Sequence, residues 1–388
     1  MRSTSLFTRR NFSSILNPNS TTPLSTKEKS RCALSLLKSE KNPQKILDIC
    51  RAAALTPESH LDRIAFTLAI SNLTASNSFD TIRSFLEKLK TRPDLKTERF
   101  FNYTMLLYGK ADMLENAVQT FKKMEEMGVA RSVKSLNALL DSCVVAKKFD
   151  EVNRIFLDFP TAYGITPDLD TYNIVIRGFC ASGSSNSVYS MLVEMKEKGV
   201  KPNVATFGNI LTGFYKEEKY EEVENVLKLM TNHGVTYGVS IENIRIHSLC
   251  KLKRSNEAKM LLDGLVKKGL KPNSDTYNHL IFGFCKEGNL KEAKNLVSVM
   301  KKKWFLSRTY FTLIYYLCKG EDFDTALTLF TESMAKNWVP SFSTMKSLVD
   351  GLVKNSKSEE ARGLVKIMKE RFNDKADPWN EIEQGIPS

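Results

Sequence analysis

The sequence predicts an all-α protein, an α-solenoid of stacked helix-turn-helix repeats. Short motifs return at a fixed spacing, and Asn173 and Asn278 lie 105 residues apart, which is three periods of 35. Within each period, apolar residues recur at helical spacing and glycine or proline separates the helices. The 388 residues are 42% hydrophobic and 26% charged, as expected of a folded protein.

The first 27 residues have the composition of an organellar transit peptide. They contain basic residues and many serines and threonines, and the first acidic residue is Glu28. The segment 10–14 resembles a mitochondrial processing site with cleavage after Phe12. We therefore expect import into the mitochondrial matrix. The plastid is the alternative address, and a disordered basic tail is the alternative structure.

The charge favours a polyanionic partner. The chain has 57 Lys and Arg against 44 Asp and Glu, a formal charge of +13. Cleavage after Phe12 lowers it only to +10, so the excess belongs to the folded part. Nucleic acid and an anionic membrane surface both fit such an excess. No run of 18 apolar residues is present, so no membrane span is expected.

Histidine and cysteine offer no catalytic or metal-binding pattern. The seven cysteines form no C-x-x-C pair, and the four histidines form no H-E-x-x-H motif. Four cysteines stand at the twelfth position of a repeat, where a small apolar side chain packs between helices: Cys180, Cys250, Cys285 and Cys318. We expect a monomer without a cofactor or metal that is not an enzyme. His247 is expected on a helix surface.

Three motifs define the repeat. Thr171-Tyr172-Asn173 returns as Thr276-Tyr277-Asn278, the segment 199–203 returns as 269–273, and the segment 178–180 returns as 283–285. Starting each unit two residues before the threonine gives eight units: 98–132, 133–168, 169–203, 204–238, 239–273, 274–306, 307–341 and 342–376. Residues 28–97 are expected to form degenerate repeats or an N-terminal cap, and residues 377–388 a C-terminal tail.

Each unit is predicted to contain two helices. In unit 274–306, one apolar face of the first helix holds Tyr277, Leu280, Ile281 and Phe284. The second helix repeats the spacing with Ala293, Leu296, Val297 and Met300. Gly288 separates the two helices. One hairpin cannot bury its apolar face alone, so the units must stack into a solenoid with an extended concave surface.

A 35-residue hairpin with Thr-Tyr-Asn near its start and Gly-x-Lys-Pro-Asn at its end resembles the pentatricopeptide repeat family, of the P-type. The resemblance covers 98–376 well and 28–97 weakly. The competing tetratricopeptide repeat is disfavoured because its Trp-x-x-Leu-Gly opening is absent. The resemblance implies binding of single-stranded RNA, either mRNA or rRNA. The chain also resembles short members linked to the mitochondrial ribosome.

By this resemblance, the fifth and last residues of a unit together read one RNA base. The pairs are Asn102/Ser132, Asn137/Asp168, Asn173/Asn203 and Asn243/Asn273. The family's code implies cytosine, then uracil, then a pyrimidine for each of the last two. Asn278 is paired with a shifted end at Leu306, and unit 204–238 offers only Gly208 and Gly238. Phe311/Ser341 and Lys346/Ala376 match no pair of the code. Continuous sequence-specific readout is therefore not expected.

A lysine stands at the thirteenth position of six units: Lys110, Lys216, Lys251, Lys286, Lys319 and Lys354. The period places them in a ladder with a spacing of roughly 10 Å, the distance between packed helices. Each lysine is expected to contact an RNA phosphate, which contributes affinity without choosing sequence. The alternative is that lysine favours helix C-termini because it complements the helix dipole.

Three functions follow as expectations. The first is an organellar RNA-binding protein that acts in RNA stabilisation, processing or translation. The second is a structural component or associate of the mitochondrial ribosome that binds rRNA. The third is a protein-binding helical scaffold. The aromatic residues of unit 307–341 are expected to fill the core or stack on bases; they are Tyr310, Phe311, Tyr315 and Tyr316.

Overall fold

The computed structural model describes residues 25–53, 55, 59–301, 307–371 and 377–387. Every regular element in these residues is a helix, which confirms the all-α prediction. Most of the expected transit peptide, including its cleavage site after Phe12, lies outside the described residues, as does Leu306.

Four helices and a short 3₁₀ turn occupy the region expected to hold degenerate repeats: α2 (Thr26–Leu37), α3 (Pro43–Ala52), α4 (His60–Ala75), α5 (Phe79–Lys90) and η1 (Pro93–Leu95). Ser25 caps α2, because the Glu28 amide donates to its Oγ and the Ser25 amide donates to Glu28 Oε2 at 2.9 Å. This capping box starts the helix inside the segment assigned to the transit peptide. Helix α2 therefore begins at Thr26, within the segment 1–27 that was assigned to the transit peptide.

From residue 98 the chain alternates between first and second helices of successive repeats. The first helices are α6 (Glu98–Lys110), α8 (Val133–Val145), α10 (Leu169–Ser182), α12 (Val204–Lys216), α14 (Val239–Lys251), α16 (Ser274–Lys286), α18 (Ser307–Lys319) and α20 (Phe342–Lys354). The second helices are α7 (Leu114–Lys122), α9 (Phe149–Tyr163), α11 (Val188–Glu197), α13 (Tyr220–Asn232), α15 (Ser255–Lys267), α17 (Leu290–Lys301), α19 (Phe323–Ala335) and α21 (Ser358–Arg371). The 3₁₀ turn η2 (Ser185–Ser187) precedes α11.

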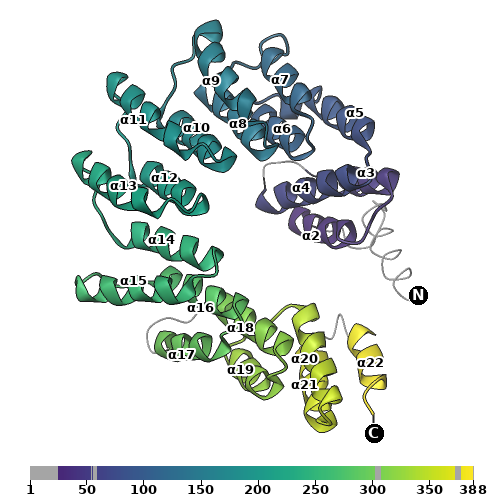
Figure 1. Cartoon of the computed structure of the whole chain (residues 1–388). Coiled ribbons are helices and arrows are strands. Elements are labelled where there is room, and N and C mark those ends of the chain that lie inside the picture. Colours follow the sequence, from purple (N-terminus) through teal and green to yellow (C-terminus); the bar gives the residue numbers. More distant parts are fainter. Residues whose placement is uncertain (1–24, 54, 56–58, 302–306, 372–376, 388) are drawn as a thin grey trace. The chain divides into compact units, whose positions relative to one another are not determined.

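The chain divides into two compact units, Met1–Gly213 and Phe214–Ser388, with the boundary inside α12. In the first unit α6 packs on α8 and α8 on α10; in the second, α14, α16, α18 and α20 pack in sequence. Second helices such as α15 contact both their own first helix and the next one. Within each unit the first helices therefore form one continuous layer, as Figure 1 shows for the stacked hairpins.

Glycine at the tenth position permits this close packing of first helices. A Cβ at Gly283 would lie 2.6 Å from Cys250 Sγ and 2.5 Å from Ser255 Oγ. Gly213 stands equally close to Cys180 of the preceding repeat. Glycine stands at position ten in four repeats, as Gly178, Gly213, Gly283 and Gly351. The position-twelve cysteines at 180, 250, 285 and 318 are buried, as expected of core residues.

The segment expected as a C-terminal tail contains a further helix, α22 (Asp377–Gln384). Its Trp379 is 3% exposed and packs edge-on against Phe342, with ring centroids 4.9 Å apart. Lys369 of α21 pairs with Glu383 at 2.6 Å. The Trp379 indole is therefore buried against the last hairpin, and helix α22 covers the end of that hairpin.

Candidate nucleic-acid interface

The second, fifth, ninth and thirteenth residues of each first helix lie on one side of it, where Gly208 and Asn243 are buried and the others are exposed or half-buried. These positions follow one another at three- and four-residue intervals, so they share one stripe of the helix. In α16 the buried residues are at positions three, four, seven, eight, ten, eleven and twelve, which leaves Asp275, Phe282 and Lys286 exposed and Asn278 half-buried. The interface expected from the sequence lies on this stripe.

Asn137 and Asp168, the expected base-reading pair of unit 133–168, are in contact. Asn137 Nδ2 donates to Asp168 Oδ1 at 3.1 Å, and Asn137 Oδ1 accepts from Thr171 Oγ1 at 2.6 Å. Asp168 also caps α10 by accepting from the Thr171 amide at 2.9 Å. Burial alone raises the pKa of Asp168, but these hydrogen bonds outweigh it and hold that pKa below its ordinary value. The Asp168 carboxylate is thus negatively charged at the N-terminus of α10, where the helix dipole stabilises negative charge.

The same arrangement returns in later repeats. Asn243 Nδ2 donates to Asn273 Oδ1 at 3.0 Å, and Asn243 Oδ1 accepts from Thr276 Oγ1 at 2.6 Å. Further contacts of this kind join Asn173 Oδ1 to Thr206 Oγ1 at 2.7 Å and Asn278 to Thr309. Asn203 accepts from the Thr206 amide at 3.0 Å, so Asn173 and Asn203 share a threonine. Each asparagine amide is therefore held in one orientation by the next repeat.

Unit 98–132 departs from this arrangement. Ser135 replaces the threonine, and Ser132 and Ser135 both donate to Glu98 Oε1, at 2.5 and 2.7 Å. The structure therefore does not join Ser132 to Asn102. Asn102 Oδ1 is buried and has no hydrogen-bond partner among the described residues.

A pocket of about 370 Å³ opens beside Asn102. Its lining combines cations, a phenol and an apolar side chain: Arg63, Glu98, Arg99, Asn102, Tyr103, Leu106 and Lys134. Tyr103 is anchored by donating to the Arg63 carbonyl at 2.8 Å. Cationic and aromatic groups around an unsatisfied amide oxygen suit a nucleotide, whose phosphate is anionic and whose base is planar.

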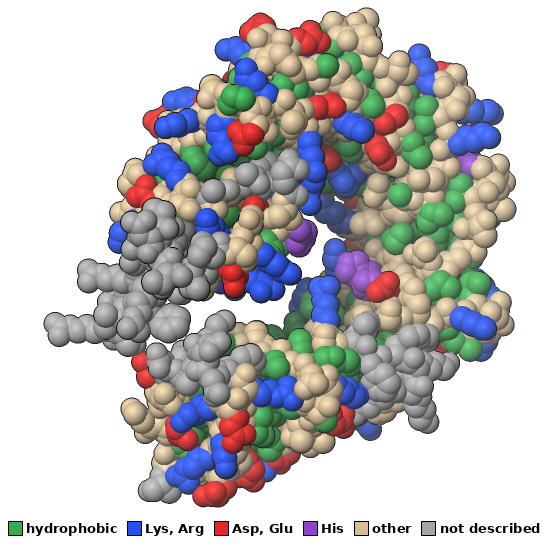
Figure 2. Space-filling model, turned by 180° about the vertical axis from the view of Figure 1, so that it is seen from behind, with side chains coloured by type: hydrophobic (Ala, Val, Ile, Leu, Met, Phe, Trp, Pro, Cys, Tyr) green, Lys and Arg blue, Asp and Glu red, His purple; other side chains and the backbone are tan. Residues whose placement is uncertain are grey.

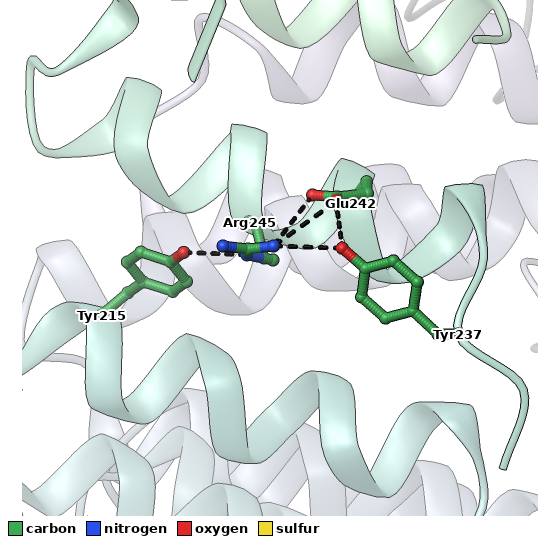
Figure 3. Close-up of polar contacts among 4 residues, drawn as sticks. All are labelled: Tyr215, Tyr237, Glu242 and Arg245. Carbon is green, nitrogen blue, oxygen red and sulfur yellow. Dashed lines mark hydrogen bonds and ion pairs between the residues drawn. The ribbon is translucent and has the colours of Figure 1, made fainter. Parts of the chain in front are cut away.

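The junction after unit 204–238, which carries glycine at both expected reading positions, is held differently. Arg245 Nε donates to Tyr215 at 3.1 Å and Arg245 Nη1 to Tyr237 at 3.1 Å, and the guanidinium pairs with Glu242 at 3.3 Å (Figure 3). Tyr237 also donates to Glu242. Burial and the Glu242 carboxylate raise the pKa of Tyr237. This network is not predictable from the sequence motifs, although the change from threonine to Ile241 at position three indicates a different junction.

The six lysines at position thirteen are each the last residue of a first helix, and each is exposed. Lys110 Nζ donates to Thr67 at 3.5 Å, and Lys354 lies 3.6 Å from Glu321. In the described part of the chain, Lys251, Lys286 and Lys319 form no ion pair. On the face shown in Figure 2, basic side chains are interspersed with acidic ones. The lysines of α14, α16 and α18 are thus available for phosphate.

His247 was expected on a helix surface, but the structure places it partly in the interior. It is half-buried, and its ring lies against that of His279, with centroids 4.4 Å apart. Burial, followed by His279 and Lys251, lowers the pKa of His247 to about 4. Tyr310 is fully buried, whereas Phe311 is half-buried and Tyr315 is 48% exposed.

The described residues contain no candidate membrane helix and no candidate metal site. No helix among them is both long and apolar enough to cross a membrane. Nor do three or more histidine, cysteine, aspartate or glutamate side chains gather there as a metal site would require.

Stacked helical hairpins that present a repeated polar pair on one face define a helical-repeat protein. Family models match along the chain: "PPR repeat family" over 167–216, "Pentatricopeptide repeat domain" over 119–182, and "PPR repeat" over 101–129, 205–235, 243–270, 268–301 and 343–371. The chain belongs to the pentatricopeptide repeat family, as the resemblance in its sequence indicated.

Relatives extend along nearly the whole chain. "Pentatricopeptide repeat-containing protein At1g11630, mitochondrial" of Arabidopsis thaliana is 48% identical over 94% of this chain and 90% of its own length. "Small ribosomal subunit protein mL103 (rPPR7)" of the same plant is 31% identical over 97% and 93%. Among solved structures, the pentatricopeptide repeat protein PPR10 from maize is 17% identical, with a TM-score of 0.40 over 92% of this chain and 60% of that one.

Proposed function

We propose that this protein binds single-stranded RNA along the exposed face of its first helices. The observation that carries the proposal is the asparagine amide at position five, which the neighbouring repeat fixes at Asn137, Asn173, Asn243 and Asn278. A fixed amide loses little entropy when it meets a base edge, which favours binding. RNA read one base per helical repeat needs this kind of regular presentation.

The free hydrogen-bonding capacity of each pair supports pyrimidine recognition. Asn137 uses Oδ1 and one N–H within the protein, so its second N–H can donate, and Asp168 Oδ2 can accept. A donor beside an acceptor complements the carbonyl and N3–H of uracil. At Asn102 the unpaired Oδ1 can instead accept from an exocyclic amine, as cytosine offers.

The protein acts in the mitochondrion, by this proposal. The acid-free basic N-terminus supports that address, and a relative of 48% identity is named mitochondrial. Binding orders a single-stranded segment and shields it, which suits stabilisation, processing or translational control of a transcript. The proposal assigns no catalytic residue.

Fluorescence anisotropy with 12-nucleotide RNAs tests the proposal. The purified chain should bind a pyrimidine-rich oligomer at least about tenfold more tightly than a purine-rich one, since one good base contact contributes roughly 1–3 kcal/mol. Replacing Asn137, Asn173 and Asn243 together by alanine should abolish that preference.

The matched control replaces three exposed asparagines of second helices, Asn225, Asn256 and Asn295, by alanine. It should bind like the wild type, and thermal melting of both triple variants establishes that they are folded. Absence of RNA binding by the folded wild-type chain would refute the proposal. Equal loss in both variants would refute the assignment of the site.

A second candidate is a component of the mitochondrial ribosome. The relative named small ribosomal subunit protein mL103 aligns over 97% of this chain, which favours this candidate specifically. Sedimentation of a mitochondrial extract separates the two functions. A ribosomal component should migrate stoichiometrically with ribosomal particles and crosslink to one rRNA site, whereas a transcript factor should crosslink to mRNA and remain outside them.

A further inference from the structure

An aromatic strip crosses the exposed face of three consecutive first helices in the second unit. It consists of His247 on α14, His279 and Phe282 on α16, and Tyr315 and Tyr316 on α18. We propose that this aromatic strip is a stacking platform for about three consecutive RNA bases and holds them without choosing sequence. The inference rests on the proposed RNA binding and assigns a second binding mode to it.

The members of the strip contact one another from helix to helix. The rings of His247 and His279 lie 4.4 Å apart at 49°, which joins α14 to α16. Phe282 meets Tyr316 edge-on at 6.3 Å, which joins α16 to α18, and Tyr316 meets Tyr315 at 5.2 Å. His279 and Phe282 are three residues apart on one helix and so share a face. The aromatic surface is therefore continuous over three repeats.

Packing of the core does not account for the outer members. Phe282 is 42% exposed and Tyr315 48% exposed, whereas the core of the same two repeats is filled by Phe284 and Tyr310, both fully buried. Burial of apolar surface stabilises a protein by roughly 25 cal/mol per Å², and the exposed rings of Phe282 and Tyr315 do not contribute this stabilisation. Contiguous exposed apolar surface of this kind marks a binding site.

Three lysines beside the aromatic strip indicate that its ligand is anionic. His247, Phe282 and Tyr315 all stand at position nine, and Lys251, Lys286 and Lys319 stand one helical turn later on the same stripe. Each repeat thus offers one aromatic ring, which can stack on a base, and one lysine, which can contact a phosphate, as each nucleotide requires. Stacking on aromatic side chains beside a basic track is how single strands are bound independently of sequence, because every base has a π-face.

The first unit lacks this arrangement. Its four repeats carry Leu106, Asp141, Arg177 and Thr212 at position nine, and Arg177 pairs with Asp141 between repeats. In the second unit, Phe311 replaces the asparagine at position five of α18, whereas α14 and α16 keep Asn243 and Asn278 at that position. The strip thus adds stacking to the hydrogen-bonded readout on α14 and α16 and supplies stacking without it on α18.

Anisotropy with the full chain tests the strip, using 12-nucleotide RNAs with uracil, with adenine, or with three central abasic residues. Phe282→Ala with Tyr315→Ala should weaken binding of both base-containing RNAs about tenfold or more. Binding of the abasic RNA, which offers phosphates but no central bases, should change by less than about twofold. Phe282→Tyr with Tyr315→Phe should restore wild-type affinity, because it keeps both rings.

The control pair, Met260→Ala with Val299→Ala, removes exposed apolar side chains from second helices and should bind like the wild type. If the Phe282 and Tyr315 alanine pair binds every RNA like the wild type, the inference is wrong while RNA binding stands. The strip would then be a surface for a protein partner. If the wild-type chain binds no RNA, the inference fails together with the proposed function.

Discussion

At the scale of single residues, one threonine performs two tasks. Thr276 donates its hydroxyl to Asn243 of the preceding repeat and its amide to Asn273 at the helix N-terminus, at 2.6 and 3.1 Å. The buried hydroxyl thus joins two repeats and also fixes the asparagine that is proposed to meet a base. Folding and recognition depend on the same hydrogen bonds. The hydrogen bond that Asn243 accepts from Thr276 also fixes the direction in which the rest of its amide group can meet a base.

The glycine at position ten should resist enlargement. Gly283→Ala places a methyl group 2.6 Å from Cys250 Sγ, so helices α14 and α16 must separate. Overpacking of this kind costs about 1–3 kcal/mol of unfolding free energy, measurable by urea denaturation. Gly264→Ala on α15 is the control, since nothing lies within 4 Å of its added Cβ. It should stabilise the chain by roughly 0.5–1 kcal/mol, and similar effects at both sites would contradict the packing argument.

The histidine pair should make stability depend on pH. The pKa of His247 is lowered to about 4, by burial first and then by His279 and Lys251. Asp275 and Arg308 also act on His279, whose pKa is lowered mainly by burial. The unfolded chain takes up protons near pH 6.5 before the folded chain does, so stability is full above that pH and falls as pH decreases toward 4.

Urea denaturation at pH 7.5 and pH 5 measures this effect. His247→Gln should lose less stability than the wild type over that interval, because it removes one group that protonates preferentially in the unfolded chain. His60→Gln, an exposed residue of the first unit, should behave like the wild type. An unchanged pH dependence in His247→Gln would show that the pair does not titrate as described.

At the scale of elements, the first and second helices divide the work. First helices carry the asparagines, the terminal lysines and the aromatic strip, whereas second helices pack on two neighbours and hold the first helices in register. At the junction of α12 and α14 the threonine and asparagine that link other repeats are missing. A network centred on Arg245 links the repeats there, through Tyr215, Tyr237 and Glu242.

Breaking that network should be costly. Glu242→Ala leaves the Arg245 guanidinium, only 13% exposed, without its carboxylate. Removing one partner of a buried pair costs about 3 kcal/mol of unfolding free energy. Glu257→Ala breaks the more exposed pair with Arg254 and should change that free energy by less than about 1 kcal/mol. Comparable urea midpoints for the two variants would show that the network contributes little.

The terminal lysines should set the salt dependence of RNA binding. Replacing Lys251, Lys286 and Lys319 by glutamine should reduce the slope of log K against log salt by about 2, since each phosphate contact in a single strand contributes roughly 0.7. Lys228, Lys267 and Lys366 are exposed lysines of second helices and form the matched control. If both triple variants lower the slope equally, only the net charge matters and the ladder has no role.

At the scale of the whole molecule, periodicity made much of the fold predictable. The first helices begin at residues 98, 133, 169, 204, 239, 274, 307 and 342, where the motifs placed the start of each unit. The turn within each repeat was harder to predict. Its fifteenth residue has positive φ in all eight repeats, but it is glycine only at Gly183 and Gly288, and Glu218, Lys253 and Ser356 adopt the same conformation. Tertiary packing overrides local preference there.

The candidate site was predictable to the extent that its residues repeat by type. Most units carry asparagine at position five and lysine at position thirteen, so aligning the units with one another reveals both positions. The aromatic strip varies between histidine, phenylalanine and tyrosine, and two of its members stand at positions other than nine. Only helix-to-helix ring contacts show that these residues form one surface.

Crosslinking of the purified chain to 4-thiouridine RNA, followed by mass spectrometry of the linked peptides, tests the central claim most directly. RNA held along the first helices should crosslink to peptides of α8, α10, α14, α16 and α18, with sites near Asn137, Asn243 and Phe282. Peptides from the second helices α13, α15 and α17 should remain unlinked. Crosslinks concentrated on those second helices, or none above a protein without RNA-binding activity, would contradict the account.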